Sequence, residues 1–269
     1  MTRLAIIGLG LIGGSLARAL RAAGQVSHIR AYDPDPRQGR TGLEQGVIDE
    51  FANSADAAAS SADLVVMAVP VLHTAEAARA LRPGLSKTAV LTDVGSTKVS
   101  VMADLTREFG ELPPRFVAAH PIAGTEKSGV AASRGELFRG HRVVLTPHPQ
   151  QDPDALATVE AMWSSVGARV VQMAPDCHDA IFAATSHLPH VLAYAFVDML
   201  THLPNADDIF SNAGGGFRDF TRIASSSPEM WHDIVRANRG EVAGLLERQI
   251  GELQELLDLM RSEDWPALK

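Results

Sequence analysis

Three glycines near the N-terminus restrict the fold of this chain more than any other feature. Gly8, Gly10 and Gly13 follow the apolar run Leu4–Ile7 and open a stretch with helical periodicity, Leu11–Ala23. In a strand–turn–helix unit the first glycine permits the tight turn, the second lets a pyrophosphate approach the backbone, and the third lets the helix pack closely on the strand. The pattern therefore predicts a dinucleotide-binding turn.

The residues around this turn favour NAD. The backbone N–H groups of Leu11 and Ile12, at the start of the predicted helix, would bind the phosphates. Asp33 follows the next strand, twenty residues after the last glycine of the turn, where a carboxylate accepts hydrogen bonds from the adenosine ribose and repels a 2′-phosphate. Arg37 and Arg40 lie nearby and weaken the preference for NAD over NADP.

The first part of the chain alternates short apolar runs with helical stretches, which is typical of a parallel sheet covered by helices. From Pro175 onward the pattern is helical. We predict an α/β fold, with an N-terminal Rossmann-type parallel-sheet domain over residues 1–174 and an all-helical C-terminal domain over residues 175–269. The predicted strands are Leu4–Ile7, His28–Tyr32, Leu64–Ala68, Ala89–Thr92, Phe116–Ala119, Arg142–Thr146 and Ala168–Met173.

Two long helices are expected in the C-terminal part, Asp176–Leu200 and Glu229–Leu259. The second has so wide an apolar face that it needs partners on several sides. One alternative is that this helix packs only on its own chain. Pairing with a second copy of the domain would supply such partners, so we expect a homodimer formed through the C-terminal helices.

Composition excludes several classes of protein. The net charge of −8, with neither sign gathered into a block, disfavours nucleic-acid and anionic-membrane partners. Cys177 is the only cysteine, and no long apolar stretch suggests a membrane span. The stretch from Arg3 to Ala19 imitates an export signal, but such a signal has no use for three glycines at dinucleotide spacing. We expect a cytoplasmic protein.

Polar residues follow two of the later strands, in the segments Asp93–Lys98 and His120–Glu126. In open α/β sheets, ligands bind at the carboxyl ends of the strands, so both segments should face the nicotinamide end of the cofactor. His120 stands directly after a strand and before a proline, which would hold it rigid and exposed. We expect it to be catalytic rather than structural.

The helical part contributes Ser186–His190 and Gly214–Arg222. His187 and His190 are three residues apart and could ligate a metal, but no third ligand accompanies them, so we predict no metal site and expect polar contacts to a substrate. Arg222 suits a bidentate clamp on a carboxylate, with an interdomain salt bridge as its alternative.

In their order along nearly the whole chain, these motifs resemble those of the prephenate and arogenate dehydrogenases of tyrosine biosynthesis. The resemblance implies NAD-dependent oxidative decarboxylation of prephenate to 4-hydroxyphenylpyruvate, in a homodimer. The segments that carry it are Gly8–Gly14, Asp93–Lys98, His120–Ser128, Ser186–His190 and Gly214–Arg222.

The resemblance also implies residue roles. His120 would be the catalytic proton acceptor on the ring hydroxyl of the substrate, and Ser96 would contact that hydroxyl and orient the histidine. Arg222 would bind a substrate carboxylate, and His190 would lie in the substrate pocket. Two more residues fall in motifs that line this pocket, Lys98 and Glu126.

Three alternatives stay open at this point. Arogenate could replace prephenate as the substrate. A β-hydroxyacid dehydrogenase has a similar layout, but its expected catalytic lysine is missing from Asp176–Leu200. A cofactor-sensing protein without enzymatic activity would keep the glycine turn, but it gives no reason for Ser96, His120 and Arg222.

Overall fold

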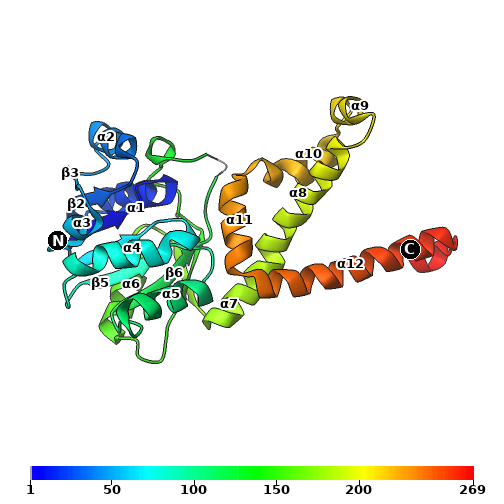
Figure 1. Cartoon of the computed structure of the whole chain (residues 1–269). Helices are drawn as coiled ribbons and strands as arrows, with labels where there is room; N and C mark the ends of the chain where they lie inside the picture. The colour runs from blue at the N-terminus through cyan, green and yellow to red at the C-terminus, as the bar shows by residue number, and fades with distance from the viewer. Residues whose placement is uncertain (1, 126) are drawn as a thin grey trace. The chain divides into compact units, whose positions relative to one another are not determined.

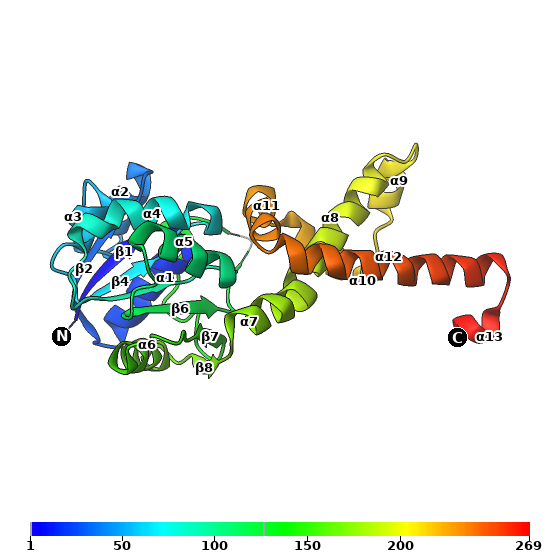
Figure 2. The same cartoon turned by 60° about the horizontal axis from the view of Figure 1, so that its bottom comes forward.

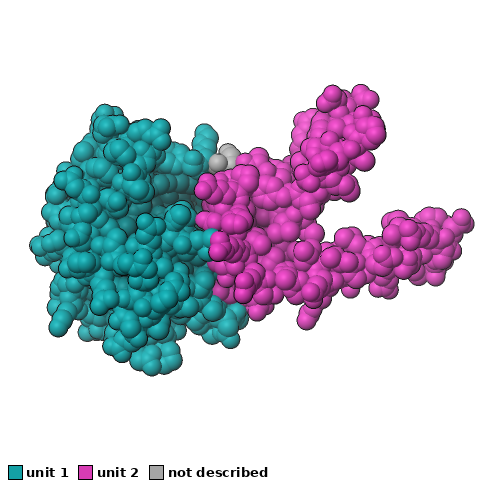
Figure 3. Space-filling view, in the orientation of Figure 1, with its two compact units in different colours: residues 1–178 teal, residues 179–269 magenta. Residues whose placement is uncertain are grey.

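The structure is a computed structural model that describes residues 2–125 and 127–269, so the candidate Glu126 lies outside the described residues. The chain forms two compact units, residues 1–178 and 179–269 (Figure 3).

Unit 1 is built on an eight-stranded sheet in the order β3-β2-β1-β4-β5-β6-β7-β8 (Figure 1). The seven predicted strands are confirmed, with ends that differ by at most two residues. The two-residue edge strand β3 was not predicted. The strands are β1 (Thr2–Ile7), β2 (Val26–Tyr32), β3 (Glu50–Phe51), β4 (Leu64–Met67), β5 (Val90–Asp93), β6 (Phe116–Pro121), β7 (Arg142–Thr146) and β8 (Arg169–Gln172).

The sheet is mixed, whereas the sequence suggested an entirely parallel one. The six strands from β3 to β6 are parallel, but β7 pairs antiparallel with β6, and β8 pairs parallel with β7. A parallel neighbour needs a crossover, usually a helix, to bring the chain back to the same end of the sheet. Among its described residues, the segment between β6 and β7 forms only the short 3-10 helix η3 (Val130–Ala132), and the chain returns to the sheet in the opposite direction.

Helices cover both faces of this sheet, and Figure 2 shows α4 and α5 on one face and α6 on the other. The core holds apolar side chains from the sheet and from α1 and α6, and Trp163 and Phe138 are among its largest buried members. The helices of unit 1 are α1 (Leu11–Ala22), α2 (Pro36–Glu44), α3 (Ala55–Ala59), α4 (Thr74–Leu81), α5 (Val99–Phe109) and α6 (Pro153–Ser165), and the boundary with unit 2 falls within α7 (Pro175–Phe182).

Unit 2 is helical throughout its described elements. The helix predicted over Asp176–Leu200 is present as α7 and α8, joined by a wider π-helical turn, Ala183–His187, just before Pro189. A proline inside a helix lacks an N–H group and crowds the preceding turn, and a wider turn accommodates it. The remaining helices are α8 (Leu188–Thr201), α9 (Ala206–Ser211), α10 (Gly215–Thr221), α11 (Pro228–Ala237), α12 (Arg239–Arg261) and α13 (Trp265–Leu268).

The prediction of one continuous helix over Glu229–Leu259 is wrong. The structure has two helices, α11 and α12, that meet at a bend at Asn238 (Figure 1). The buried side chain of Asn238 donates to the backbone carbonyl of Asp179 at 2.8 Å and lies 3.2 Å from His187 Nδ1. The bend therefore brings a polar residue to the two buried polar groups that it satisfies.

One helix of the described chain, Pro175–Thr201, is long and apolar enough to cross a membrane by length and composition alone. Only 22% of its most apolar window is buried within the chain. Length and composition alone do not assign this helix to a membrane.

Candidate active site

The glycine turn connects β1 to α1, and its geometry explains each glycine. Gly8 has φ +98°, and a Cβ there would collide with the carbonyl group of Ala68. A Cβ on Gly13 would collide with the carbonyl oxygen of Gly8 and would lie 3.0 Å from Ile6 Cγ2. Around Gly10, in contrast, a Cβ would meet no atom within 4 Å. The backbone is therefore open to a ligand at the middle glycine.

Asp33 follows β2 and holds this turn in shape. Its Oδ2 accepts a hydrogen bond from the backbone N–H of Leu9 at 2.8 Å, and its Oδ1 accepts one from the backbone N–H of Asp35 at 2.9 Å. A carboxylate has about four acceptor positions, so two remain for a ligand. Asp35 is itself paired with the side chain of Arg37 at 2.9 Å, and the hydrogen bonds from Arg37 lower the pKa of Asp35 to about 2.

Lys98 and Asp93 form a buried ion pair at the carboxyl end of β5. Lys98 Nζ lies 2.5 Å from Asp93 Oδ2 and donates to the carbonyl oxygen of Ala119 at 2.6 Å, while Asp93 Oδ1 accepts from the N–H of Ala119 at 3.0 Å. The Lys98 side chain is fully buried, where an unpaired charge would be costly. Both charged groups therefore bond the backbone of Ala119, the residue directly before His120. The motif suggested that Lys98 contacts the substrate, but in the structure its buried side chain contacts protein groups.

His120 is half-buried and lies near the end of β6, with Val144 opposite it in β7. Its Nδ1 lies 2.8 Å from Nε2 of His178, and the two rings meet edge to face with centroids 5.0 Å apart. His178, in α7, is fully buried. The sequence did not single out His178, because one histidine in a predicted helix carries no signal of a partner 58 residues away.

Ser96 lies half-buried in the turn between β5 and α5. Since β5 and β6 are neighbouring parallel strands, Ser96 and His120 both belong to the carboxyl-end edge of the sheet. The glycine turn follows β1, whose parallel neighbour β4 pairs in turn with β5, so it opens at the same edge. Unit 1 thus combines the glycine turn with a serine and a histidine at one edge of the sheet.

In unit 2, the ring of His190 is held in place by a hydrogen bond to Ser186 and by stacking on Trp231. Its Nδ1 lies 2.8 Å from the carbonyl oxygen of Ser186, so Nδ1 carries the proton and Nε2 has a free lone pair. The ring stacks on Trp231, with centroids 3.4 Å apart and planes 19° apart. Burial lowers the pKa of His190, and the positive charge of Arg222 lowers it further, against the opposing effect of the bond to Ser186.

Arg222 begins the 3-10 turn η5 (Arg222–Ser225) and is exposed in the chain. Among the described residues it makes no ion pair, so its guanidinium is available to an anion. Arg218, four positions earlier, donates to the carbonyl oxygen of Ala213 at 2.9 Å. The neutral His190 and the cationic Arg222 thus give unit 2 a polar site suited to a carboxylate.

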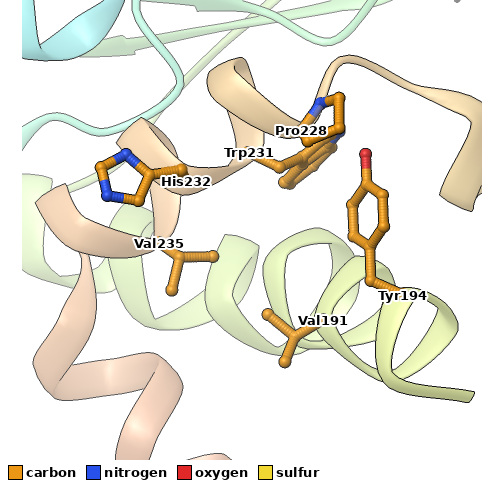
Figure 4. Close-up of a pocket in the computed structure, with 6 residues that line it drawn as sticks. All are labelled: Val191, Tyr194, Pro228, Trp231, His232 and Val235. Carbon is orange, nitrogen blue, oxygen red and sulfur yellow. The ribbon is translucent and has the colours of Figure 1, made fainter. Parts of the chain in front are cut away.

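An apolar cleft of about 270 Å³ lies beside this site, between α8 and α11 (Figure 4). The Tyr194 hydroxyl donates to the carbonyl oxygen of Ser226 at 2.6 Å, and burial raises the pKa of Tyr194. Trp231 lines the cleft and also stacks on His190. The sequence missed this cleft because its lining resembles an ordinary apolar helix face: Val191, Tyr194, Pro228, Trp231, His232 and Val235.

The fold and these residues define a class of protein, a nucleotide-binding α/β dehydrogenase with a helical second domain. Family comparison makes the assignment specific. A model of the prephenate dehydrogenase nucleotide-binding domain matches residues 16–172, and a model of the prephenate dehydrogenase dimerization domain matches residues 174–269. The chain belongs to the prephenate dehydrogenase family.

Individual relatives agree with this assignment. The chain is 40% identical to prephenate dehydrogenase from Aquifex aeolicus, solved in complex with hydroxyphenyl propionate and NAD+, with a TM-score of 0.91 over 100% of this chain and 93% of that one. It is 37% identical to cyclohexadienyl dehydrogenase from Zymomonas mobilis, covering 97% of this chain and 89% of the relative. It is 36% identical to prephenate dehydrogenase from Bacillus subtilis, covering 96% of this chain and 70% of the relative.

Family membership decides between the alternatives that the sequence left open. Both domains match the prephenate dehydrogenase family along most of their length. This match argues against a β-hydroxyacid dehydrogenase and against a cofactor sensor without enzymatic activity. Prephenate and arogenate differ in a single group of the side chain, which is a keto group in prephenate and an amino group in arogenate.

Proposed function

We propose that this protein catalyses the NAD-dependent oxidative decarboxylation of prephenate to 4-hydroxyphenylpyruvate in the cytoplasm, as a homodimer. The observation that carries the proposal is a half-buried histidine, His120, at the sheet edge onto which the glycine turn opens. Membership in the prephenate dehydrogenase family supplies the reaction that such a histidine would serve.

NAD fits the residues of the turn. The open side of Gly10 leaves room for a pyrophosphate, and the backbone N–H groups of Leu11 and Ile12 begin α1, where helix geometry favours bound phosphate. The carboxylate of Asp33, with acceptor positions left over, suits the ribose hydroxyls. Arg37, one of the two nearby arginines, is paired with the carboxylate of Asp35, which makes it less available to a 2′-phosphate.

The chemistry needs orientation and one base. NAD, when bound, supplies the hydride acceptor. The ring carboxylate leaves as carbon dioxide and its bonding electron pair stays in the ring, while the hydroxyl-bearing carbon loses a hydride. The ring becomes aromatic, so much of the driving force lies in the substrate. His120, in its neutral form, accepts the proton of the ring hydroxyl at Nε2. The hydroxyl of Ser96 contacts the same ring hydroxyl and orients it toward His120.

The substrate carboxylate is bound by the helical unit. Arg222 presents a planar guanidinium that can donate two parallel hydrogen bonds to a carboxylate. His190, which Trp231 holds in place, offers Nε2 to a donor on the substrate side chain. We assign Lys98 a positioning role through Ala119, and Glu126 a place in the pocket-lining motif.

Arogenate is the second candidate substrate, and the similarity to a cyclohexadienyl dehydrogenase favours keeping it. Arogenate has an amino group where prephenate has a keto group. The free lone pair of His190 Nε2 could accept a hydrogen bond from that amine. Steady-state rates with prephenate and with arogenate, each with NAD and with NADP, measure both preferences in one set of assays.

The test of the proposed base is His120→Asn, which keeps a polar side chain but removes the proton acceptor. We expect kcat to fall by about 10²- to 10⁴-fold, the usual contribution of general acid–base catalysis, while NAD affinity is retained. His141→Asn, at an exposed histidine of the same unit, is the matched control and should behave as the wild type. Near-normal turnover of His120→Asn would remove His120 from the proposal.

A further inference from the structure

The hydrogen bond between His120 and His178 is a feature that the proposed reaction does not yet use. His178 is fully buried, and its backbone N–H donates to the carbonyl oxygen of Ala174 at 2.9 Å in the first turn of α7. Its Nε2 lies 2.8 Å from Nδ1 of His120. His120, the base of the proposed reaction, is therefore hydrogen-bonded to a second imidazole, His178, which belongs to helix α7.

The proton in this hydrogen bond can be assigned from the proposed role of His120. Two nitrogen lone pairs at 2.8 Å would repel each other, so one of the two atoms carries a proton. A neutral imidazole has one proton, and in the proposed reaction the nitrogen that receives the substrate proton is Nε2, which must be unprotonated. The proton of His120 is then on Nδ1, which donates to Nε2 of His178. His178 in turn carries its own proton on Nδ1.

We propose that His178 is the positioning residue of the active site: it fixes the ring orientation and the tautomer of His120 and stabilises the imidazolium that forms when His120 takes up the substrate proton. The proposal rests on the proposed function. When His120 takes up the substrate proton, the hydrogen bond from its Nδ1 to His178 becomes charge-assisted. This hydrogen bond therefore strengthens during the proton transfer itself.

A neutral partner suits this location. The neighbouring Asp93 and Lys98 already neutralise each other on the backbone of Ala119, directly before His120. A carboxylate at position 178 would add a charge at a fully buried site, where charges are costly. An imidazole accepts the same hydrogen bond without a formal charge, and it performs the orienting task that an aspartate performs in hydrolase triads.

Two substitutions separate positioning from packing. His178→Leu fills a similar volume but cannot accept a hydrogen bond, whereas His178→Gln keeps an acceptor near the position of Nε2. We expect kcat of His178→Leu to fall by about 10²-fold or more, with KM and NAD affinity within about threefold of the wild type, and His178→Gln to recover at least about tenfold of the loss.

Several outcomes would overturn the inference. His178→Leu with kcat within about threefold of the wild type would show that the hydrogen bond is not used. Equal losses in both variants, together with weaker NAD binding and a lower Tm, would show a packing role only. Absence of turnover in the wild type with prephenate and with arogenate would instead refute the proposed function, so the two failures are distinguishable.

A second readout does not depend on turnover. Nitrogen-15 NMR of the histidine side chains distinguishes the two neutral tautomers, and His120→Asn identifies the signal of His120. We expect His120 to carry its proton on Nδ1 in the wild type and to lose that preference in His178→Leu. A His120 signal with the proton on Nε2 in the wild type would contradict the assignment.

Discussion

At the scale of single residues, Arg218 and Arg222 of the helical unit differ in the contacts that their side chains make. Arg222 is exposed and makes no ion pair among the described residues, while Arg218 donates to the carbonyl oxygen of Ala213. Only Arg222 acts on His190, whose pKa its charge helps to lower. A guanidinium beside a neutral imidazole gives the site a net positive charge, which suits a carboxylate.

We therefore predict different effects for the two arginines. Arg222→Ala should raise KM for the carboxylate substrate by roughly 10- to 100-fold, because hydrogen bonds to charged groups contribute about 1.5–3 kcal/mol. Arg218→Ala, the matched control, should leave KM within about twofold, since it removes only one exposed hydrogen bond. Steady-state kinetics measure both, and an unchanged KM in Arg222→Ala would assign this arginine to structure.

The sequence was informative for residues whose position follows from a motif. His120 and Ser96 follow strands, and the glycines and Asp33 have fixed spacing, so their place at one sheet edge could be predicted. The full burial of Lys98 and the partnership of His120 with His178 depend on contacts between distant segments. Nothing local in the sequence encodes such contacts.

At the scale of elements, the boundaries that the sequence missed are those where tertiary contacts override periodicity. The apolar spacing continues across Asn238, so the pattern predicts one helix. The bend between α11 and α12 depends instead on the bonds from Asn238 to Asp179 and His187. The edge strand β3 has only two residues, too few to show an alternating pattern.

We predict that Asn238→Ala lowers the free energy of unfolding by about 1–3 kcal/mol, because it removes the hydrogen bonds that a buried side chain makes to two buried groups. Asn205→Ala is the matched control: Asn205 is exposed, and its side chain does not cap α9, so the effect should be within about 0.5 kcal/mol. Urea unfolding measures both. Equal midpoints for the wild type and Asn238→Ala would contradict the account of the bend.

At the scale of the whole molecule, the helical unit leaves a large apolar surface uncovered within one chain. Members of this surface lie on α12, where Leu253 is 52% and Leu256 is 41% exposed. The apolar helix Pro175–Thr201 is likewise little buried. The C-terminal residues match a domain described as a dimerization domain. These observations support a homodimer in which α12 contributes to the contact.

The prediction at this scale concerns mass in solution. The wild type should have twice the chain mass of 28.7 kDa, and the double substitution Leu253→Glu with Leu256→Glu should shift it toward the single chain. Leu43→Glu, which places a charge on a leucine 45% exposed in α2, is the control and should leave the mass unchanged. Light scattering at assay concentration measures all three, and a monomeric wild type would refute the dimer.

We propose above all that this chain couples hydride transfer to decarboxylation of a cyclohexadiene. The most direct test is to incubate the wild-type protein with prephenate and NAD and to quantify NADH, carbon dioxide and 4-hydroxyphenylpyruvate together. The account predicts that the three products form in equal amounts. Binding of NAD without NADH formation from either prephenate or arogenate would contradict it.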